Sequence, residues 1–460
     1  MVSPLIFRQY DIRGLEKEDL DDNSVESIGK AFGTYLLRKG KKEAVVGKDV
    51  RLSGPRVFKS LVKGLLSTGC NVVDIGTVPT PVFYFAIWYY KKDGGLIITA
   101  SHNPPEYNGF KMCNGIDALY GDEITSIYTL IKNNDFIHGS GNMTSLSVME
   151  DYKKHVIADI KIPKKLKVVI DCGNGAAGLV APEVLRSMGV ELIELFTEPD
   201  GNFPNHTADP TVEKNVKDLM RTVVEKGAHI GIGFDGDVDR IGVVDEKGRL
   251  LFGDTLLGIY AKEVLENNPG AEIVFEVKSS QGLVERIQQL GGKPMMWKAG
   301  HSLLKAKMKE DNALLGGEVS GHMFFKDRHP GYDDAIYGAL RILEILAHSD
   351  KTVSELAAEI PAYISTPELR VDCPDDVKFD VMDKLIHYFK SNYKVIDVDG
   401  VRVLFDTGWS LIRPSNTQPV LVVRMEAKTK EDLRNIVKIT YDKLCEYPEI
   451  DPVNLKPYTE

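Results

Sequence analysis

The strongest constraint on the fold is a pattern that recurs three times along the 460-residue chain. Each copy has an apolar strand, a polar or glycine-rich turn, an amphipathic helix, a glycine and a second strand. The copies fall at residues 44–47, 57–66 and 72–75; at 168–171, 182–188 and 192–196; and at 273–275, 283–290 and 294–297. Gly69, Gly189 and Gly291 follow the three helices, where a helix stop is expected. The pattern predicts three β-α-β units, and a chain this long is expected to divide into several domains.

The C-terminal segment follows a different pattern. It predicts a helix at 379–393, followed by strands at 394–398, 401–406, 410–412 and 420–427. Asp399-Gly400 and Thr407-Gly408 are typical of hairpin turns, and Thr429 with Asp432 resembles the capping box of a closing helix. We therefore predict an α/β chain with three tandem, similar, mixed-sheet α/β domains, followed by a smaller α+β domain with an antiparallel sheet.

Ser101 stands in a loop that cannot be helical. The apolar run at 96–98 predicts a strand before it. Pro104 and Pro105 exclude a helix after it, and the following proline favours an extended backbone at Asn103. The serine is therefore expected at the end of a strand, where catalytic groups of α/β proteins tend to lie. Taken alone, a serine in this position more often only caps a turn.

An acidic loop supplies a second candidate site. Asp235, Asp237 and Asp239 alternate with other residues, so that in an extended loop they share one face and can converge on a hard cation. Strands are predicted on both sides, at 229–234 and 241–244. An EF-hand calcium loop is the main alternative, and Glu246 fits its last position. It is disfavoured because Arg240 stands where that loop needs glycine and because the flanks are not helical.

Two further polar loops complete the pattern. Glu318, Ser320 and His322 offer a carboxylate, a hydroxyl and an imidazole, which suit the hydroxyl groups of a sugar. A later loop between two prolines suits a phosphate dianion. Its candidate ligands are Arg413, Ser415, Asn416 and Thr417. Either loop alone is more often an ordinary polar surface loop.

Together these four segments resemble the α-D-phosphohexomutase family, in its phosphomannomutase/phosphoglucomutase branch. The resemblance covers nearly the whole chain, from the motif at 7–14 (FRQYDIRG) to the loop at 413–419, with the motifs in the family's order. It implies four domains. These are an α/β domain with a phosphoserine loop at 1–148, an α/β domain with a metal-binding loop at 149–250, an α/β domain with a sugar-binding loop at 251–364, and an α+β phosphate-binding lid at 365–460.

The resemblance also implies roles for individual residues. Ser101 is the implied phosphoserine, and together with Asp235, Asp237 and Asp239 it is expected to bind Mg²⁺. Lys111 and His301 match proton-handling residues of the family. The remaining implied catalytic residues are Arg240, beside the transferring phosphoryl group, and Arg13, from the N-terminal motif. The implied substrate-binding residues are Tyr10, Lys278, Glu318, Ser320, His322, Arg413, Ser415, Asn416 and Thr417.

The expected activity is interconversion of hexose 1-phosphate and hexose 6-phosphate through a phosphoserine enzyme. Glucose 1,6-bisphosphate or mannose 1,6-bisphosphate is the implied intermediate and activator. Glucose and mannose differ only at C2, and no residue can be assigned to that hydroxyl, so both sugars, and glucosamine, remain open. The alternatives are a metal-dependent sugar-phosphate phosphatase with the same serine, a non-enzymatic sugar-phosphate sensor, and an NAD(P)-dependent dehydrogenase.

The dehydrogenase alternative rests on Gly173-Asn174-Gly175-Ala176-Ala177-Gly178. This G-x-G-x-x-G segment follows a predicted strand and precedes a predicted helix, and Glu191 and Glu194 lie about 20 residues on, as in dinucleotide-binding folds. No accompanying residues for hydride transfer are evident, and the resemblance implies a structural turn.

Charge and cysteine content restrict the partners and the compartment. The net charge of −10 argues against a nucleic-acid partner and leaves small sugar phosphates as the expected ones, with monomer and homo-oligomer both open. Five scattered cysteines without a C-x-x-C pair predict a reduced, cytoplasmic protein. The longest apolar run, at 81–90, is too short to span a membrane and is expected to be a helix with one buried face.

Overall fold

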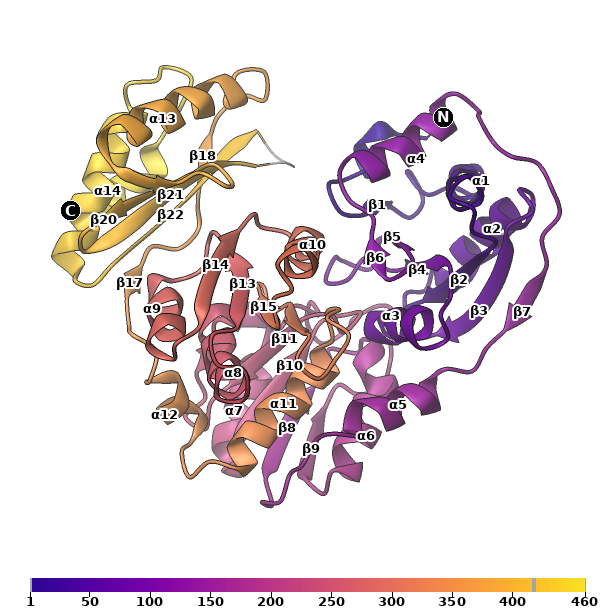
Figure 1. Ribbon diagram of the computed structural model, residues 1–460, viewed down its shortest axis with the longest axis horizontal. Helices are drawn as coiled ribbons and strands as arrows, with labels where there is room; N and C mark the ends of the chain where they lie inside the picture. Colours follow the sequence, from indigo (N-terminus) through magenta and orange to yellow (C-terminus); the bar gives the residue numbers. More distant parts are fainter. Residues whose placement is uncertain (1, 416–418, 460) are drawn as a thin grey trace. The chain divides into compact units, whose positions relative to one another are not determined.

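The computed structural model describes residues 2–415 and 419–459. The described chain folds as two compact units (Figure 1). Unit 1 comprises Met1–Leu256 and Leu314–Leu356, and unit 2 comprises Leu257–Ala313 and Ala357–Glu460. The boundary between the units therefore falls within the third repeat-bearing segment.

The first sheet of unit 1 is mixed, with strand order β1-β5-β4-β2-β3-β7 and β6 added beside β5. Its strands are β1 (Ile12–Leu15), β2 (Glu43–Lys48), β3 (Asn71–Thr77), β4 (Gly94–Ile98), β5 (Tyr107–Asn114), β6 (Asp117–Ala118) and β7 (Met143–Ser145). The segment also contains η1 (Pro4–Ile6), α1 (Asp22–Arg38), α2 (Gly54–Leu66), α3 (Thr80–Tyr89) and α4 (Asp122–Lys132). Strand β2 runs parallel to β3 and β4, whereas β5 runs antiparallel to β1 and β4. The first predicted β-α-β unit is thereby confirmed.

Helices α1 and α2 pack closely because glycines face each other across them. A Cβ added to Gly29 would lie 2.3 Å from the Leu61 carbonyl oxygen, and one added to Gly64 would lie 2.2 Å from the Glu26 carbonyl oxygen. The expectation for α3 was wrong in one respect. Residues 80–87 of this helix are all buried, so it has no polar face over most of its length.

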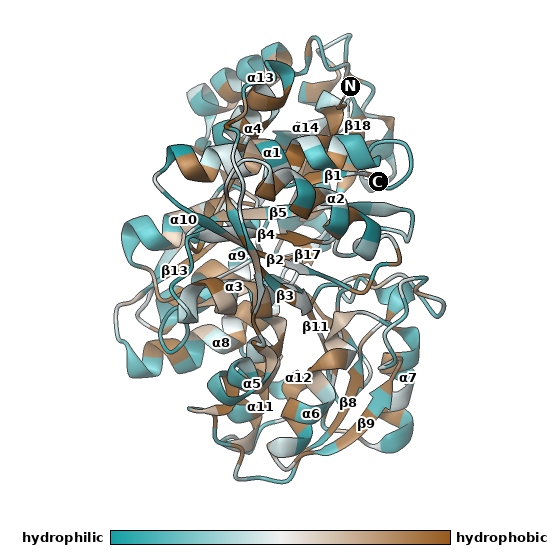
Figure 2. Ribbon diagram, turned by 90° about the vertical axis from the view of Figure 1, so that its right-hand side faces the viewer, coloured by the Kyte–Doolittle hydropathy of each residue, from teal (hydrophilic) through white to brown (hydrophobic). Residues whose placement is uncertain are grey.

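The second sheet of unit 1 has the order β12-β11-β10-β8-β9. Its strands are β8 (Lys167–Asp171), β9 (Glu191–Leu195), β10 (Ile230–Phe234), β11 (Ile241–Val244) and β12 (Leu250–Leu251). The accompanying helices are α5 (Met149–Ile157), η2 (Ala176–Leu179), α6 (Ala181–Ser187), η3 (Glu213–Asn215) and α7 (Lys217–Lys226). Strand β8 is parallel to β9 and β10, and β11 is antiparallel to β10, which confirms the second predicted unit and the mixed sheet. Figure 2 shows hydrophobic residues along β8 and hydrophilic residues on α7, as a covered strand and a surface helix require.

The rest of unit 1 is a short antiparallel hairpin and the helices that follow it. Strands β15 (Leu315–Gly317) and β16 (Met323–Phe325) pair with each other. Helix α11 (Ala335–Ala347) is buried along most of its length, and α12 (Val353–Ala357) ends at the boundary with unit 2. The hairpin thereby presents the loop that contains Glu318, Ser320 and His322.

Unit 2 begins within α8 (Gly253–Asn267) and contains the third predicted β-α-β unit. Strand β13 (Glu272–Glu276), α9 (Gln281–Gln289) and β14 (Lys293–Trp297) form it, and the two strands are parallel as expected. Helix α10 (His301–Asp311) follows. No described helix has both the length and the apolar composition needed to span a bilayer.

The C-terminal part of unit 2 is α+β with an antiparallel sheet, as predicted. Its strands are β17 (Ile364–Ser365), β18 (Leu369–Asp372), β19 (Lys394–Ile396), β20 (Val401–Phe405), β21 (Gly408–Pro414) and β22 (Val420–Ala427). Helices α13 (Lys378–Asn392), α14 (Lys430–Leu444) and η4 (Val453–Tyr458) accompany them. Thr429 caps α14 by accepting a hydrogen bond from the Asp432 N–H, which confirms the predicted start of this helix.

Candidate active site

Ser101 lies just beyond the end of β4 in a strained backbone conformation. Its φ of +48° lies in the left-handed region, which side chains other than glycine seldom occupy. The serine is 3% exposed. Its hydroxyl donates a 2.5 Å hydrogen bond to Asp235 Oδ2, and its Oγ lies 3.1 Å from His102 Nδ1. The serine loop (residues 99–106, between β4 and β5) and the acidic loop (residues 235–240, between β10 and β11) were predicted separately, and they meet at this hydroxyl.

The acidic loop is a tight connection between the antiparallel strands β10 and β11. Asp235 Oδ1 accepts the N–H groups of Asp239 and Arg240, at 3.0 and 3.1 Å, which turns the loop back on itself. One carboxylate oxygen each of Asp235, Asp237 and Asp239 lies within 4.8 Å of the others, and all three residues are buried. Because strands rather than helices flank the loop, it is not an EF-hand.

The triad fits a divalent cation. Asp237 Oδ1 and Asp239 Oδ1 are buried and accept no hydrogen bond within the described residues. A buried carboxylate oxygen without a donor is costly, and oxygen ligands of this kind are those that hard divalent ions take up. Burial, followed by repulsion from Asp239 and Asp237, raises the pKa of Asp235 well above its ordinary value. A cation bound at the triad would relieve that repulsion.

Lys111 of β5 supplies a positive charge to the triad. Its Nζ donates to Asp237 Oδ2 at 2.6 Å and also pairs with Asp239. Burial alone would lower the pKa of Lys111, but Asp237 and Asp239 outweigh it and raise the pKa above its ordinary value. Thr80, at the start of α3, orients Asp237 further, because its hydroxyl donates to Asp237 Oδ2 at 2.6 Å and its N–H to the Asp237 carbonyl oxygen at 2.8 Å.

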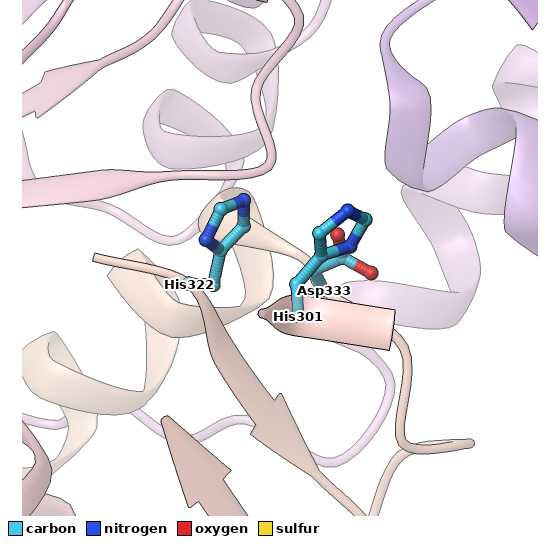
Figure 3. A group of neighbouring side chains, drawn as sticks. All are labelled: His301, His322 and Asp333. Atoms are coloured by element: carbon cyan, nitrogen blue, oxygen red, sulfur yellow. The ribbon is translucent and has the colours of Figure 1, made fainter. Parts of the chain in front are cut away.

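The β15–β16 loop brings an imidazole to the same place. His322 Nε2 lies 3.3 Å from Asp239 Oδ2, and His322 Nδ1 lies 2.8 Å from Glu318 Oε2. Burial opposes protonation, but the Asp239 and Glu318 carboxylates raise the pKa of His322 to about 9. Ser320 Oγ lies 3.1 Å from His322 Nδ1. Figure 3 shows His322 together with Asp333, a buried carboxylate that also helps to raise the pKa of Lys111.

Two arginines flank the serine loop. Arg13 of β1 donates from Nη1 to Asn103 Oδ1 at 2.7 Å, and its Nη2 pairs with Asp11 at 2.5 Å. The backbone of Arg240, just before β11, forms a bridge with His322. The Arg240 charge, then burial, then the Arg13 charge lower the pKa of His102 well below its ordinary value. Tyr10, the other residue taken from the N-terminal motif, lies in the bend before β1 and is partly exposed.

The remaining sequence candidates lie in unit 2. Lys278 pairs with Glu276 at 3.3 Å, and His301 is buried at the first position of α10. Arg413 of β21 pairs with Asp399 at 3.0 Å, and its Nε is buried with no acceptor within the described residues, as expected of a guanidinium that binds an anion. Ser415 directly follows β21, whereas Asn416 and Thr417 lie outside the described residues.

Sequence reasoning missed three residues that contact the serine or acidic loops: Arg51, Thr80 and His102. His102 could have been recognised from the sequence, because it directly follows the candidate serine. Arg51 and Thr80 were not recognisable, because a polar residue after a strand is ordinarily solvated. In the structure both are buried, and Arg51 donates to three backbone carbonyl oxygens of the serine loop and to that of Tyr107.

The G-x-G-x-x-G segment supports the acidic loop. The N–H of Ala176 donates to the Gly236 carbonyl oxygen at 3.0 Å, and a Cβ on Gly175 would lie 2.9 Å from the same oxygen. The absent side chain at Gly175 therefore permits a close approach to the acidic loop. This contact gives the segment a structural role of the kind that the resemblance implied.

The fold and these side chains together define an enzyme of the phosphohexomutase class, a group of isomerases. Family models for the four domains of phosphoglucomutase/phosphomannomutase match the chain in order. The α/β/α domains I, II and III match residues 4–138, 147–248 and 252–363, and the C-terminal domain matches residues 368–443. The chain belongs to the phosphoglucomutase/phosphomannomutase family, as the resemblance indicated.

Individual relatives agree with this assignment. The phosphomannomutase/phosphoglucomutase of Pseudomonas putida is 46% identical over 94% of this chain and 93% of its own length. A solved phosphoglucomutase/phosphomannomutase family protein from Burkholderia thailandensis superposes with a TM-score of 0.90 at 42% identity, covering 95% of this chain and 96% of that one. An Aspergillus fumigatus N-acetylphosphoglucosamine mutase solved with glucose 1,6-bisphosphate shares the fold, with a TM-score of 0.57 at 15% identity over 95% of this chain and 94% of that one. The chain is thus a hexose phosphate mutase, and nothing in these comparisons favours a phosphatase or a dehydrogenase.

Proposed function

We propose that this mutase interconverts the 1- and 6-phosphates of glucose and mannose by passing a phosphoryl group through Ser101. The observation that carries the proposal is the 2.5 Å hydrogen bond from Ser101 Oγ to Asp235, one of the buried acidic triad. A serine phosphoester is stable in water, so a phosphorylated Ser101 can persist until a sugar phosphate arrives. Phosphoryl transfer then depends mainly on positioning and charge neutralisation, which a rigid buried site provides.

Asp235, Asp237 and Asp239, with an oxygen of phosphorylated Ser101, are the proposed ligands of Mg²⁺. When bound, the ion would neutralise charge on the oxygens of the transferring phosphoryl group. The support for this assignment is the pair of buried carboxylate oxygens without hydrogen-bond donors described above. The Lys111 ammonium, held against Asp237 and Asp239, favours the ionised form of Asp239 and holds both carboxylates in place.

In the first transfer, a sugar hydroxyl oxygen forms a bond to phosphorus as the bond from phosphorus to Ser101 Oγ breaks. The hydroxyl proton passes to a base, and the serine oxygen is left as an alkoxide that a proton donor neutralises. Lys111 carries a proton at Nζ and is the proposed donor in this step, and His301 is the proposed second proton-transfer residue. The product is glucose or mannose 1,6-bisphosphate, and the reverse transfer from its other phosphate restores phosphoserine.

The other candidates are proposed to hold the substrate. Glu318 and Ser320 would bind sugar hydroxyls, and His322, charged below a pKa of about 9, would face a phosphoryl oxygen. Arg13 and Arg240 would neutralise the transferring phosphoryl group. Binding of the other phosphate, together with the rest of the sugar, is assigned to Tyr10, Lys278, Arg413, Ser415, Asn416 and Thr417.

The domain boundaries 1–148, 149–250, 251–364 and 365–460 remain our proposal, with the last domain as a phosphate-binding lid. The gaps between the family matches, at 138–147, 248–252 and 363–368, support these boundaries. All five cysteines lie in the described residues and form no disulfide bond there; four are buried and Cys445 is exposed. This supports a reducing compartment such as the cytoplasm.

The test is an assay of glucose 1-phosphate, mannose 1-phosphate and glucosamine 1-phosphate with Mg²⁺ and a trace of the matching bisphosphate. We expect isomerised sugar phosphate, little inorganic phosphate, and loss of turnover in Ser101→Ala. Ser27→Ala on α1 is the matched control, because the hydroxyl of Ser27 donates to the Asn23 carbonyl oxygen of its own helix, away from the serine and acidic loops. Normal turnover by Ser101→Ala, or stoichiometric release of inorganic phosphate, would contradict the proposal.

A further inference from the structure

Arg51 is a buried arginine whose guanidinium lies against the backbone of the serine loop. Its side chain is fully buried. Nη1 donates to the carbonyl oxygens of Pro104 and Tyr107 at 2.8 and 2.9 Å. Nη2 donates to those of Ser101 and Asn103 at 2.8 and 2.6 Å. One planar cation therefore binds three carbonyl oxygens of the serine loop and that of Tyr107, the first residue of β5.

The serine loop needs such a partner. Pro104 and Pro105 have no backbone N–H, so this stretch has fewer backbone donors than a helix or hairpin, and Arg51 adds donors to those of Asn103 and Tyr107, whose N–H groups reach the Ala100 and Pro104 carbonyl oxygens. The charge of Arg51 is balanced by the buried Asp49, whose Oδ2 lies 3.3 Å from Arg51 Nε. Arg51 Cζ also lies over the Phe203 ring, 5.2 Å from its centroid. These contacts leave the guanidinium little freedom to move.

Ser101 is held on both sides of its left-handed backbone. Its N–H donates to Thr99 Oγ1 at 2.9 Å, and its carbonyl oxygen accepts from Arg51. The backbone of Gly236 limits movement further, since a Cβ added there would lie 2.4 Å from the Ser101 carbonyl oxygen. With both peptide groups fixed, the side chain is directed so that Oγ meets Asp235.

We infer that Arg51 is a positioning residue. It holds Ser101 in the strained conformation that aims Oγ at the acidic triad, and Thr99 holds the other side of the same residue. Arg51 binds the serine loop through backbone oxygens and takes no proton or phosphoryl group. The inference rests on the proposed phosphoryl transfer through Ser101. It adds Arg51 and Thr99 to the residues on which that transfer depends.

The test compares Arg51→Lys with the wild type. Lysine keeps the charge beside Asp49, but a single ammonium cannot span four carbonyl oxygens. We expect kcat to fall about 100-fold, the loss associated with a displacement of reacting groups of about 1 Å, while KM stays within about twofold. In Arg51→Ala, added guanidinium should restore part of the activity, and sodium chloride at the same ionic strength should not. Arg341→Lys is the matched control, because Arg341 of α11 is equally buried and pairs with Asp327.

Thr99 provides a test that does not depend on Arg51 variants folding. Thr99→Val keeps the shape of the side chain and removes the oxygen that accepts the Ser101 N–H, so kcat should fall without a change in KM. Thr99→Ser keeps that oxygen and should restore kcat.

The wild-type protein is first examined for phosphate on Ser101 by peptide mass spectrometry. Absence of transferable phosphate there would overturn the proposed function, and this inference with it. Phosphate on Ser101, with kcat within about twofold of wild type in Thr99→Val and in folded Arg51→Lys, would overturn this inference alone.

Discussion

Gly236→Ala is expected to slow phosphoryl transfer because Gly236 touches the backbone of Ser101. A Cβ at this position would lie 2.4 Å from the Ser101 carbonyl oxygen, whereas contacts of Cβ atoms are essentially never under 3.0 Å. The two groups must therefore separate by at least about 0.6 Å, and overpacking of this kind typically costs about 1–3 kcal/mol. Arg51 holds the same oxygen at 2.8 Å and resists the shift. A displacement approaching 1 Å at a reacting group lowers the rate by up to about 100-fold, so we expect kcat to fall about 10- to 100-fold.

The assay measures kcat and KM for glucose 1-phosphate with saturating Mg²⁺, together with the thermal unfolding midpoint. Gly54→Ala is the matched control, because a Cβ at Gly54 would meet nothing nearer than 3.6 Å and alanine suits a helix start at least as well as glycine. The reasoning is refuted if folded Gly236→Ala keeps kcat within about twofold of wild type, since the calculated overlap would then have no effect on Ser101.

Three further perturbations test other parts of the account. Asp237→Asn should weaken Mg²⁺ binding and so raise the Mg²⁺ concentration that gives the half-maximal rate. An unchanged Mg²⁺ titration would contradict the assignment of Asp237 to the metal site. Arg413→Ala should raise KM for the sugar phosphate more than it lowers kcat, and unchanged kinetics would contradict its phosphate-binding role. His206 is partly buried 3.1 Å from Asp171, and although burial opposes it, this carboxylate raises the pKa of His206 above its ordinary value. The pair therefore stabilises the fold fully below about pH 6.5 and less as pH rises through the raised pKa. His206→Gln should accordingly lose more stability in urea at about pH 6 than at about pH 9, and equal losses would contradict this pairing.

The β-α-β units were predictable because their strands are short apolar runs and their helices carry periodic apolar positions. The predicted strand at 72–75 and helix at 57–66 differ from β3 and α2 only at their ends. The exact ends of an element are set by backbone hydrogen bonds, which the hydrophobic pattern does not show. Helix α3 shows the limit of this reasoning. Its apolar run indicated a helix, but the sequence alone did not distinguish one buried face from burial all round.

The acidic triad was predictable because alternate carboxylates in a loop between strands share one face. The partners of these carboxylates were less evident, since they depend on distant segments coming together. Thr80 contacts Asp237 across 157 positions of sequence, and Arg51 contacts Ser101 across 50. Arginine and threonine are both common after a strand, so the sequence does not single them out. Arg51 and Thr80 matter because they are buried, where their polar groups must bond the loops beside them.

The account depends most on Ser101 giving its phosphoryl group to a hexose. Enzyme carrying radiolabelled phosphate is mixed with Mg²⁺ and an excess of unlabelled glucose 1-phosphate, and the label is followed in the Ser101 peptide and in the sugar. We predict that the label leaves that peptide and appears in glucose phosphates, with little inorganic phosphate. Label that stays on the protein, or that leaves only as inorganic phosphate, would contradict the central claim.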